Sequence, residues 1–250
     1  MQIVFVGGWG FTQEHYQPFL KGLEERLSEK GCIKYIDNTS RVSFDPPFIG
    51  IGHSLGVAYL LKHHAHNLSA LINIGGFPCF VKTPQQPYGA SPKILRAMQQ
   101  KFDTQPEQVL HDFYKNCGVE TIELLPTAEN NRYANSFWTP AYAGDSDGVC
   151  TIKSNPLRRQ GSSSFLLEED WYQNLRKGLL MLGDTTFFTP PLCPTLSLHS
   201  VEDTIVSVAN AKHFGTETIL YEGASHALPL THTTQVIEDI VAFLTRHSCP

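Results

Sequence analysis

The chain has 250 residues, of which 41% are hydrophobic and 17% charged, and its formal net charge is −5. These values are typical of a globular protein with a sizeable core, and they exclude a disordered chain and a strongly basic, nucleic-acid-binding one. No apolar run reaches the roughly 18 residues of a membrane-spanning helix, and a strand pattern begins at residue 2 without a basic leader. We therefore expect a cytoplasmic monomer that binds neither nucleic acid nor a membrane.

Six cysteines and eleven histidines are present, but none has the spacing of a metal site. The densest histidine group, at residues 62–66, has no carboxylate or cysteine beside it, and we interpret it as the polar end of a helix. The cysteines are expected to be free, mostly buried thiols. The sequence thus predicts neither a metal nor a cofactor.

The first third of the chain alternates between β-branched apolar runs and helical periodicity. The predicted elements are a strand at 2–6, a helix at 12–30, a strand at 32–36, a strand at 48–51, a helix after residue 56 and a strand at 70–74. The link at 37–47 is too short and too broken for a full helix. This alternation indicates a mostly parallel sheet with right-handed crossovers and helices on both faces.

The alternation stops near residue 82 and resumes after Trp171. The intervening part contains helical stretches at 91–102 and 106–117, followed by a Gly/Asp/Ser/Asn-rich segment around 143–164. After it, the sequence predicts a helix to about Met181, a strand at 194–199, a further helix, a strand at 218–221 and a last helix at 234–247. We expect an α/β core in two parts, residues 1–80 and 171–250, with a mainly helical lid inserted at 81–170.

A Gly-x-Ser-x-Gly motif, Gly52-His53-Ser54-Leu55-Gly56, lies between a predicted strand and a predicted helix. In this context the motif is typical of a nucleophile elbow, a sharp turn that presents its serine at the tip, often with positive φ. The glycines are needed because a Cβ at either position would meet the crossing strand or helix. We interpret His53 as structural rather than as a base. The alternative is an ordinary turn in which Ser54 caps the helix.

A serine nucleophile needs a base and a group that orients the base. Asp203 follows one late predicted strand and His226 follows the next, so the order Ser54, Asp203, His226 is that of α/β-hydrolases. Among the histidines, only His226 combines a late strand end, small neighbours and a following helix. Glu202 and Asp184 compete with Asp203 for the role of the acid. Alternatively, His226 is a capping or core histidine.

The oxyanion formed in such a reaction needs two backbone donors. One is expected to be the N–H of Leu55, after the nucleophile, and the other the N–H of Trp9 in the glycine-rich loop 7–10. The indole of Trp9 could also form a wall of an acyl pocket, or it could simply pack in the core. Together these residues predict a serine esterase that forms and hydrolyses an acyl-enzyme.

The chain resembles the pimeloyl-[acyl-carrier-protein] methyl ester esterases of biotin synthesis, a family of α/β-hydrolases. The matching stretches are Gly8-Trp9-Gly10, Gly52 to Gly56, Pro78-Cys79-Phe80, residues 92–100, Asp203 and residues 224–227. The resemblance implies hydrolysis of the methyl ester of pimeloyl-acyl carrier protein. It also implies that the acyl chain contacts Phe113, Tyr114 and Cys117 in the lid, with Trp9, Ser54, Leu55 and His226 completing the pocket.

The chain departs from this family in three places. Gly7 stands where the family has a histidine, and the strands that precede the first motif are missing, which implies a sheet truncated at its N-terminal side. The stretch between Trp9 and Ser54 is short, so one flanking helix is expected to be absent. The family's carrier-binding arginines fall here on residues such as Gln108 and Asp112, which leaves other basic candidates: Lys101, Arg132, Arg158 and Arg159.

Two other functions are compatible with the same residues. The first is a generalist short-chain carboxylesterase or thioesterase without a carrier-protein partner. The second is a binding protein that keeps the fold but turns over little, although a complete Ser-Asp-His set argues against it.

Overall fold

The computed structural model describes residues 2–27, 32–39, 42–45, 47–119 and 163–247, with only the backbone described for 163–169. The strands are β1 (Ile3–Val6), β2 (Ile33–Ile36), β3 (Phe48–His53), β4 (Leu68–Ile74), β5 (Thr195–Ser200) and β6 (Glu217–Tyr221). The α-helices are α1 (Gln17–Leu27), α2 (Leu55–His64), α3 (Pro92–Phe102), α4 (Pro106–Asn116), α5 (Ser163–Leu182), α6 (Leu228–Thr231) and α7 (Thr233–His247).

The six described strands form one sheet in the order β2-β1-β3-β4-β5-β6, and every pairing is parallel. The predicted parallel sheet is therefore confirmed. Because all strands run the same way, the loops that follow β1, β3, β4, β5 and β6 meet at one edge. This edge, the carboxyl edge, holds every residue predicted for the reaction's chemistry.

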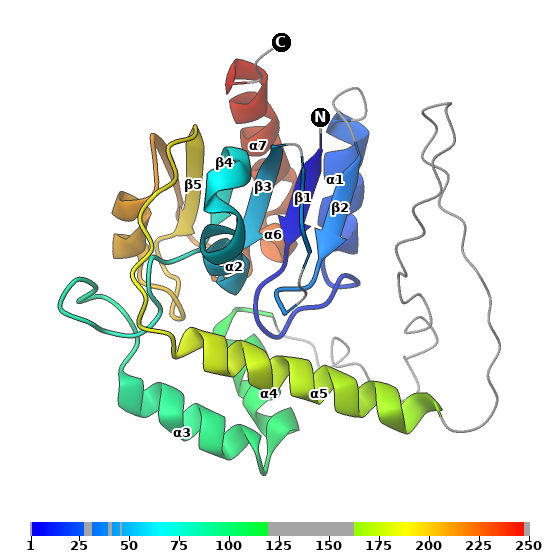
Figure 1. The fold of residues 1–250 in the computed structure, drawn as a ribbon, viewed down its shortest axis with the longest axis vertical. Helices are drawn as coiled ribbons and strands as arrows, with labels where there is room; N and C mark the ends of the chain where they lie inside the picture. The colour runs from blue at the N-terminus through cyan, green and yellow to red at the C-terminus, as the bar shows by residue number, and fades with distance from the viewer. Residues whose placement is uncertain (1, 28–31, 40–41, 46, 120–162, 248–250) are drawn as a thin grey trace.

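Helices cover both faces of the sheet. Successive side chains along each strand point to opposite faces, and on both faces they are apolar and buried under helices. Ile3 and Phe5 of β1 belong to a core shared with α1 and α7, whereas Val4 and Val6 belong to a second core shared with α2. Figure 1 shows α2 on the near face of the sheet. The strands are buried on both sides, which explains their nearly continuous apolar sequences.

A layer of three helices, α3, α4 and α5, lies across the carboxyl edge (Figure 1). Pro92 and Pro106 stand at the starts of α3 and α4, where a missing N–H costs nothing, and Ser91 caps α3 through a bond from Lys93 N. α5 is continuous across residue 170, where the inserted lid was expected to end. The part of that expected lid from residue 120 to residue 162, which includes most of the Gly/Asp/Ser/Asn-rich segment, lies outside the described residues.

Two predicted helices differ from the structure. The helix expected at 12–30 begins at Gln17, because Thr12 donates its N–H to His15 Nδ1 (2.9 Å) and this local bond holds a turn. The helix expected between β5 and β6 is a 3-10 helix, Val208–His213, since the connection is too short for more. Between β2 and β3 the described residues contain no helix, as the short link predicts.

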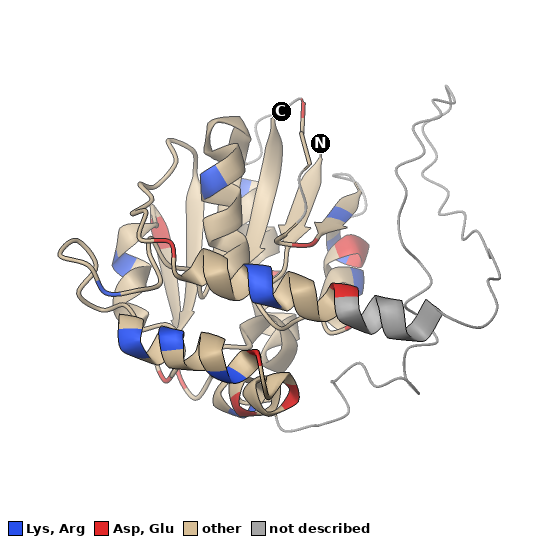
Figure 2. Ribbon diagram, turned by 60° about the horizontal axis from the view of Figure 1, so that its bottom comes forward, with Lys and Arg blue, Asp and Glu red and all other residues tan. Residues whose placement is uncertain are grey.

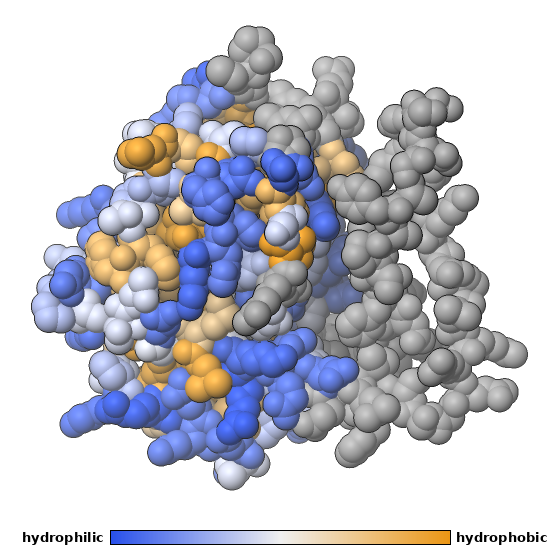
Figure 3. Space-filling model, in the orientation of Figure 1, coloured by the Kyte–Doolittle hydropathy of each residue, from blue (hydrophilic) through white to orange (hydrophobic). Residues whose placement is uncertain are grey.

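No helix among the described residues is both long and apolar enough to cross a membrane. In the view of Figure 3, apolar residues lie in separate patches among hydrophilic ones. Cys79 and Cys117 are buried free thiols, as expected for most of the cysteines, whereas Cys193 is partly exposed and Cys32 exposed. Cys150 and Cys249 lie outside the described residues.

Candidate active site

Ser54 occupies a strained turn between β3 and α2. Its φ of 54° makes it the one non-glycine residue with positive φ in the described part of the chain. A Cβ at Gly56 would lie 2.1 Å from the carbonyl oxygen of Val6 in β1, and a Cβ at Gly52 would lie 2.7 Å from Val57 N in α2. The two glycines therefore permit the close crossing predicted for an elbow. The Ser54 hydroxyl makes no capping bond to α2, which removes the simple cap as an explanation.

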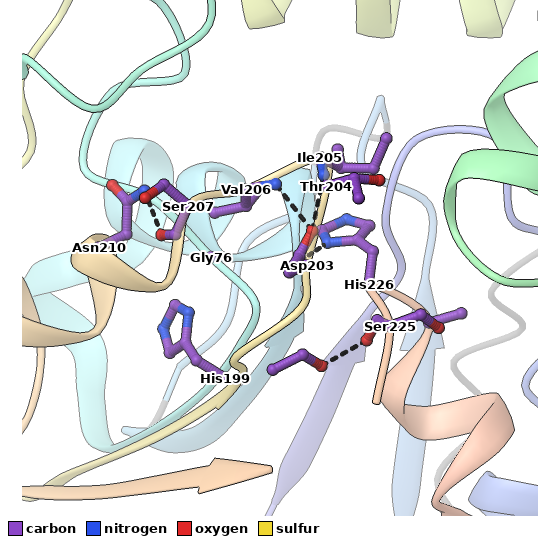
Figure 4. A network of polar contacts seen from close by, with 12 residues as sticks. Gly76, His199, Asp203, Thr204, Ile205, Val206, Ser207, Asn210, Ser225 and His226 are labelled. Carbon is purple, nitrogen blue, oxygen red and sulfur yellow. Dashed lines mark hydrogen bonds and ion pairs between the residues drawn. The ribbon is translucent and has the colours of Figure 1, made fainter. Parts of the chain in front are cut away.

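Asp203 and His226 form a buried pair at the same edge of the sheet. Asp203 Oδ2 lies 2.7 Å from His226 Nδ1, and the two side chains are 2% and 0% exposed. The other carboxylate oxygen, Oδ1, accepts the N–H groups of Ile205 and Val206, both at 2.8 Å. Figure 4 shows the carboxylate held between these amides and the imidazole. Its position is therefore set by three donors.

The electrostatics of Asp203 favour a carboxylate. Burial is the largest single influence and would raise the pKa. The charge and hydrogen bond of His226, together with the amides of Ile205 and Val206, outweigh it and leave the pKa of Asp203 below its usual range. An ionised Asp203 accepts the Nδ1 proton of His226, so in the neutral ring the lone pair lies on Nε2.

Two sets of contacts place His226 beside the elbow. Ser54 N donates to Ile74 O (2.8 Å), and a Cβ on the next residue, Gly75, would lie 3.5 Å from His226 Nδ1. On the other side, the rings of His53 and His226 lie 5.1 Å apart. The Nε2 atom of His226 is buried and has no hydrogen-bond partner among the described residues. A lone pair on this atom is therefore available as a base.

The competing acids lie elsewhere. Asp184 forms a salt bridge with Lys62 at 2.7 Å, and Glu202 accepts the N–H of Gly223 at 2.9 Å. Among the described residues, neither forms a hydrogen bond or ion pair with His226. Asp203 is thus the one acid of the three candidates that holds the imidazole.

The loop after β1 lies against Ser54, where an oxyanion site requires it. A Cβ at Gly8 would be 3.2 Å from Ser54 Cβ. The N–H of Gly8 is engaged by Tyr16 Oη (2.9 Å), whereas Trp9 N and Leu55 N have no protein acceptor in the described structure. These two amides, both predicted as oxyanion donors, remain available.

The indole of Trp9 packs beneath α5. Its Nε1 donates to the carbonyl oxygen of Leu175 (2.7 Å), and a Cβ on Gly178 would lie 2.6 Å from Trp9 Cδ1. The ring of Phe113 meets the indole edge-on with centroids 4.8 Å apart. The indole is therefore packed in the core, as one of the two interpretations expected. Its contact with an acyl chain stays a prediction.

The lid residues implied by the resemblance also lie close to this loop. Phe113, Tyr114 and Cys117 are all buried. The Tyr114 hydroxyl donates to the carbonyl of Gly10, and Cys117 O accepts the N–H of Ala227, next to His226. Their contact with an acyl chain is a proposal. The adjacent Lys115 and Asn116 are exposed.

The sequence did not reveal one part of the site, a hydrogen-bonded chain through Tyr16 and His53. Tyr16 Oη lies 2.7 Å from His53 Nδ1, and His53 Nε2 lies 3.0 Å from the carbonyl oxygen of His226. In the sequence, Tyr16 has the spacing of an apolar residue on the first predicted helix, together with Phe19, Leu20 and Leu23, and nothing in this spacing signals a partner 37 residues away. The position of His53 beside the nucleophile was the available signal.

No protein-family model matches the chain, and no curated protein sequence matches it at a significant level. Solved structures do match. An esterase from Exiguobacterium antarcticum superposes with a TM-score of 0.63 at 15% identity, over 98% of this chain and 92% of the esterase. The RedJ thioesterase of the prodiginine pathway in Streptomyces coelicolor gives 0.55 at 12% identity, over 97% and 85% of the two chains.

A third match names the fold. The protein MGS-M2, an alpha/beta hydrolase enzyme from a deep-sea metagenome library, gives a TM-score of 0.56 at 11% identity, over 98% of this chain and 89% of that one. Among the residues that the structure describes, the parallel sheet and its flanking helices agree with this fold. The chain has the α/β-hydrolase fold.

Proposed function

We propose that the chain is a cytoplasmic serine hydrolase that cleaves acyl esters through Ser54, His226 and Asp203. One observation carries the proposal: a buried Asp203–His226 pair leaves the imidazole Nε2 free beside a serine at positive φ. Functional sites combine strained backbone, a buried carboxylate–imidazole pair and free amides far more often than ordinary packed regions of a protein do.

The reaction follows from these groups. His226 Nε2 takes the proton of Ser54 as its Oγ attacks the ester carbonyl, and Asp203 stabilises the imidazolium that forms. The imidazolium then protonates the leaving alcohol, and the acyl-enzyme remains on Ser54. Water, deprotonated by His226, attacks this ester and releases the acid and the free serine.

The amides of Trp9 and Leu55 hold the oxyanion in both halves of the reaction. Trp9, Ser54 and Leu55 are 3%, 6% and 1% exposed, so these amides lie in a region that is largely shielded from water. Loss of one such donor costs about 3 kcal/mol of transition-state stabilisation. Rigid donors of this kind act on the transition state more than on the bound ester.

For the substrate, we propose the methyl ester of pimeloyl-acyl carrier protein. The support is the resemblance of the Gly8-Trp9-Gly10 loop, residues 78–80 and the first lid helix to the esterases of biotin synthesis. Apolar Trp9 and Phe113 beside the elbow suit a long acyl chain.

A carrier protein would need a basic surface near the site. Figure 2 shows Lys and Arg positions along α3 and α5, which cover the carboxyl edge. Between these helices lies a groove of about 300 Å³ lined in part by Arg96 and Arg176. Lys101, the described one of the four basic candidates, already pairs with Asp112 at 2.8 Å, so we favour Arg96 over it. Arg132, Arg158 and Arg159 lie outside the described residues.

A generalist carboxylesterase or thioesterase is the second candidate function. The similar structures include proteins described as esterases and a thioesterase, and they share the fold of this chain. The same Ser54 chemistry would serve a thioester, because only the leaving group changes. A non-catalytic binding protein is the third candidate function. Binding alone does not explain why two backbone amides beside a strained serine have no acceptor.

One comparison separates these functions. The kcat/KM for pimeloyl-carrier methyl ester should greatly exceed that for p-nitrophenyl butyrate, and the gene should rescue a biotin auxotroph that lacks its own esterase. Ser54→Ala should abolish both activities. Preference for the small ester together with failed rescue would favour the generalist, and no turnover of any ester or thioester by folded protein would favour the binding protein.

A further inference from the structure

A chain of hydrogen bonds connects the oxyanion loop to the main chain of His226. Gly8 N donates to Tyr16 Oη at 2.9 Å, and Tyr16 Oη lies 2.7 Å from His53 Nδ1. The other ring nitrogen of His53, Nε2, lies 3.0 Å from the carbonyl oxygen of His226. Tyr16 and His53 are both completely buried.

The protons in this chain can have only one arrangement. Burial, reinforced by the nearby His226, lowers the pKa of His53 to about 3, so the ring is neutral at neutral pH. A carbonyl oxygen only accepts, so the proton of His53 lies on Nε2 and its Nδ1 accepts from the hydroxyl of Tyr16. The same hydroxyl accepts from Gly8. The direction of every bond in the chain is thus fixed, and the ring cannot flip without breaking two bonds.

The two ends of the chain are the parts whose relative position matters for catalysis. Gly8 immediately precedes Trp9, whose free amide is a proposed oxyanion donor. The carbonyl held at the other end belongs to His226, the proposed base. His53 itself immediately precedes Ser54. One chain of side chains therefore touches the backbone next to all three reacting groups.

Packing alone does not require these polar atoms. Tyr16 lies among aromatic rings, with Phe5 at 4.7 Å and Phe11 at 5.8 Å between centroids. A phenylalanine would fill this space without a hydroxyl to desolvate. A buried hydroxyl or imidazole costs free energy unless it is fully bonded, and here both are bonded to parts of the candidate site.

We propose that Tyr16 and His53 are positioning residues that hold the oxyanion loop, the nucleophile and the base in one fixed geometry. The inference rests on the proposed function. It assigns no proton transfer with substrate to either residue; they act through Trp9 and His226. Their loss should weaken binding of the transition state while ground-state binding persists.

The test uses Tyr16→Phe, His53→Gln and the double variant of the full chain, with Tyr35→Phe as the matched control. Tyr35 is a neighbour of Tyr16 (6.4 Å between ring centroids), and its hydroxyl makes no hydrogen bond in the described structure. The measurements are kcat and KM for p-nitrophenyl butyrate, inhibition by a trifluoromethyl ketone and by butyrate, and thermal midpoints.

Tyr16→Phe removes both hydrogen bonds of this hydroxyl, so it should lower kcat at least about tenfold and leave KM within twofold, because the chain acts in the transition state. Affinity for the ketone, which forms an oxyanion adduct, should fall by the same factor, whereas that for butyrate should not change. The double variant should be no slower than the slower single variant, because both break the same chain. Tyr35→Phe should match wild type.

Several results would overturn the inference. One is that Tyr16→Phe and His53→Gln both have the kcat of Tyr35→Phe. Another is that the losses of the two single variants add in the double variant. The third is that affinity for the ketone and affinity for butyrate fall equally. If His53→Gln fails to fold, Tyr16→Phe alone decides, since it keeps the aromatic ring. A folded wild type that hydrolyses none of the esters would instead refute the proposed function and this inference with it.

Discussion

Replacement of Asp203 by asparagine should abolish most activity through a change of tautomer, and the structure shows why. Asp203 Oδ1 accepts two amide protons, from Ile205 and Val206 at 2.8 Å, while Oδ2 faces His226 Nδ1. In Asp203→Asn the remaining oxygen must face the two amides, because an NH₂ group there would oppose two N–H donors. The NH₂ group then faces His226 Nδ1. That nitrogen becomes an acceptor, and the proton moves to Nε2.

A proton on Nε2 removes the lone pair that should deprotonate Ser54. The fold should be preserved, since shape and the amide bonds are kept. In serine proteases the same tautomer change lowers kcat about 10⁴-fold. The buried geometry here is equivalent, so we expect a loss on the order of 10⁴, or about 5 kcal/mol of activation free energy.

The assay is the steady-state kcat for p-nitrophenyl butyrate at pH 7.5, with far-UV circular dichroism to check the fold. The matched control is Glu202→Gln, the same type of change one residue earlier, at an exposed carboxylate whose acceptor role toward Gly223 a glutamine can keep. Glu202→Gln should stay within twofold of wild type. Retention of more than a tenth of wild-type kcat by folded Asp203→Asn would refute the reasoning.

Two further predictions concern stability. Gly56→Ala should lower the free energy of unfolding by about 3 kcal/mol, because its Cβ would lie 2.1 Å from Val6 O. Gly22→Ala, whose Cβ meets only the tip of Ile237, should change it far less in the same urea titration. Burial lowers the pKa of His199 to about 4 in the folded protein. In the unfolded chain this histidine takes up a proton near pH 6.5, whereas in the folded protein it stays neutral at that pH. Stability should therefore fall with pH below about 6.5, and between pH 7 and 5 wild type should lose about 2 kcal/mol more than His199→Gln; parallel losses would contradict this.

The sheet and the elbow could be predicted because their signals are local. A strand buried on both faces must be apolar throughout, as in residues 70–74, and a strand that crosses a helix closely must have glycines at fixed spacing, as at Gly52 and Gly56. Asp203 and His226 were found because parallel strands bring their following loops to one edge. Their contact at 2.7 Å agrees with that reasoning.

Features that depend on individual side-chain contacts could not be predicted. The start of α1 is set by a bond between Thr12 and His15, which competes with a helical pattern that the sequence displays clearly. The link between Tyr16, which lies just before α1, and His53 joins residues that are 37 positions apart in the sequence. A glycine inside a helix is unfavourable by propensity, yet Gly178 in α5 makes room for the indole of Trp9. The first of these properties is set by a local side-chain bond and the other two by tertiary packing, and hydrophobic periodicity predicts none of them.

The central claim is that Ser54 is an activated nucleophile, and covalent labelling tests it most directly. The intact protein, treated with a small organophosphonate at pH 7.5, should gain the mass of one adduct, and peptide mapping should place it on Ser54. Ser54→Ala should gain none, and Asp203→Asn should react far more slowly. Folded wild-type protein that stays unlabelled, or an adduct on another serine that persists in Ser54→Ala, would contradict the account.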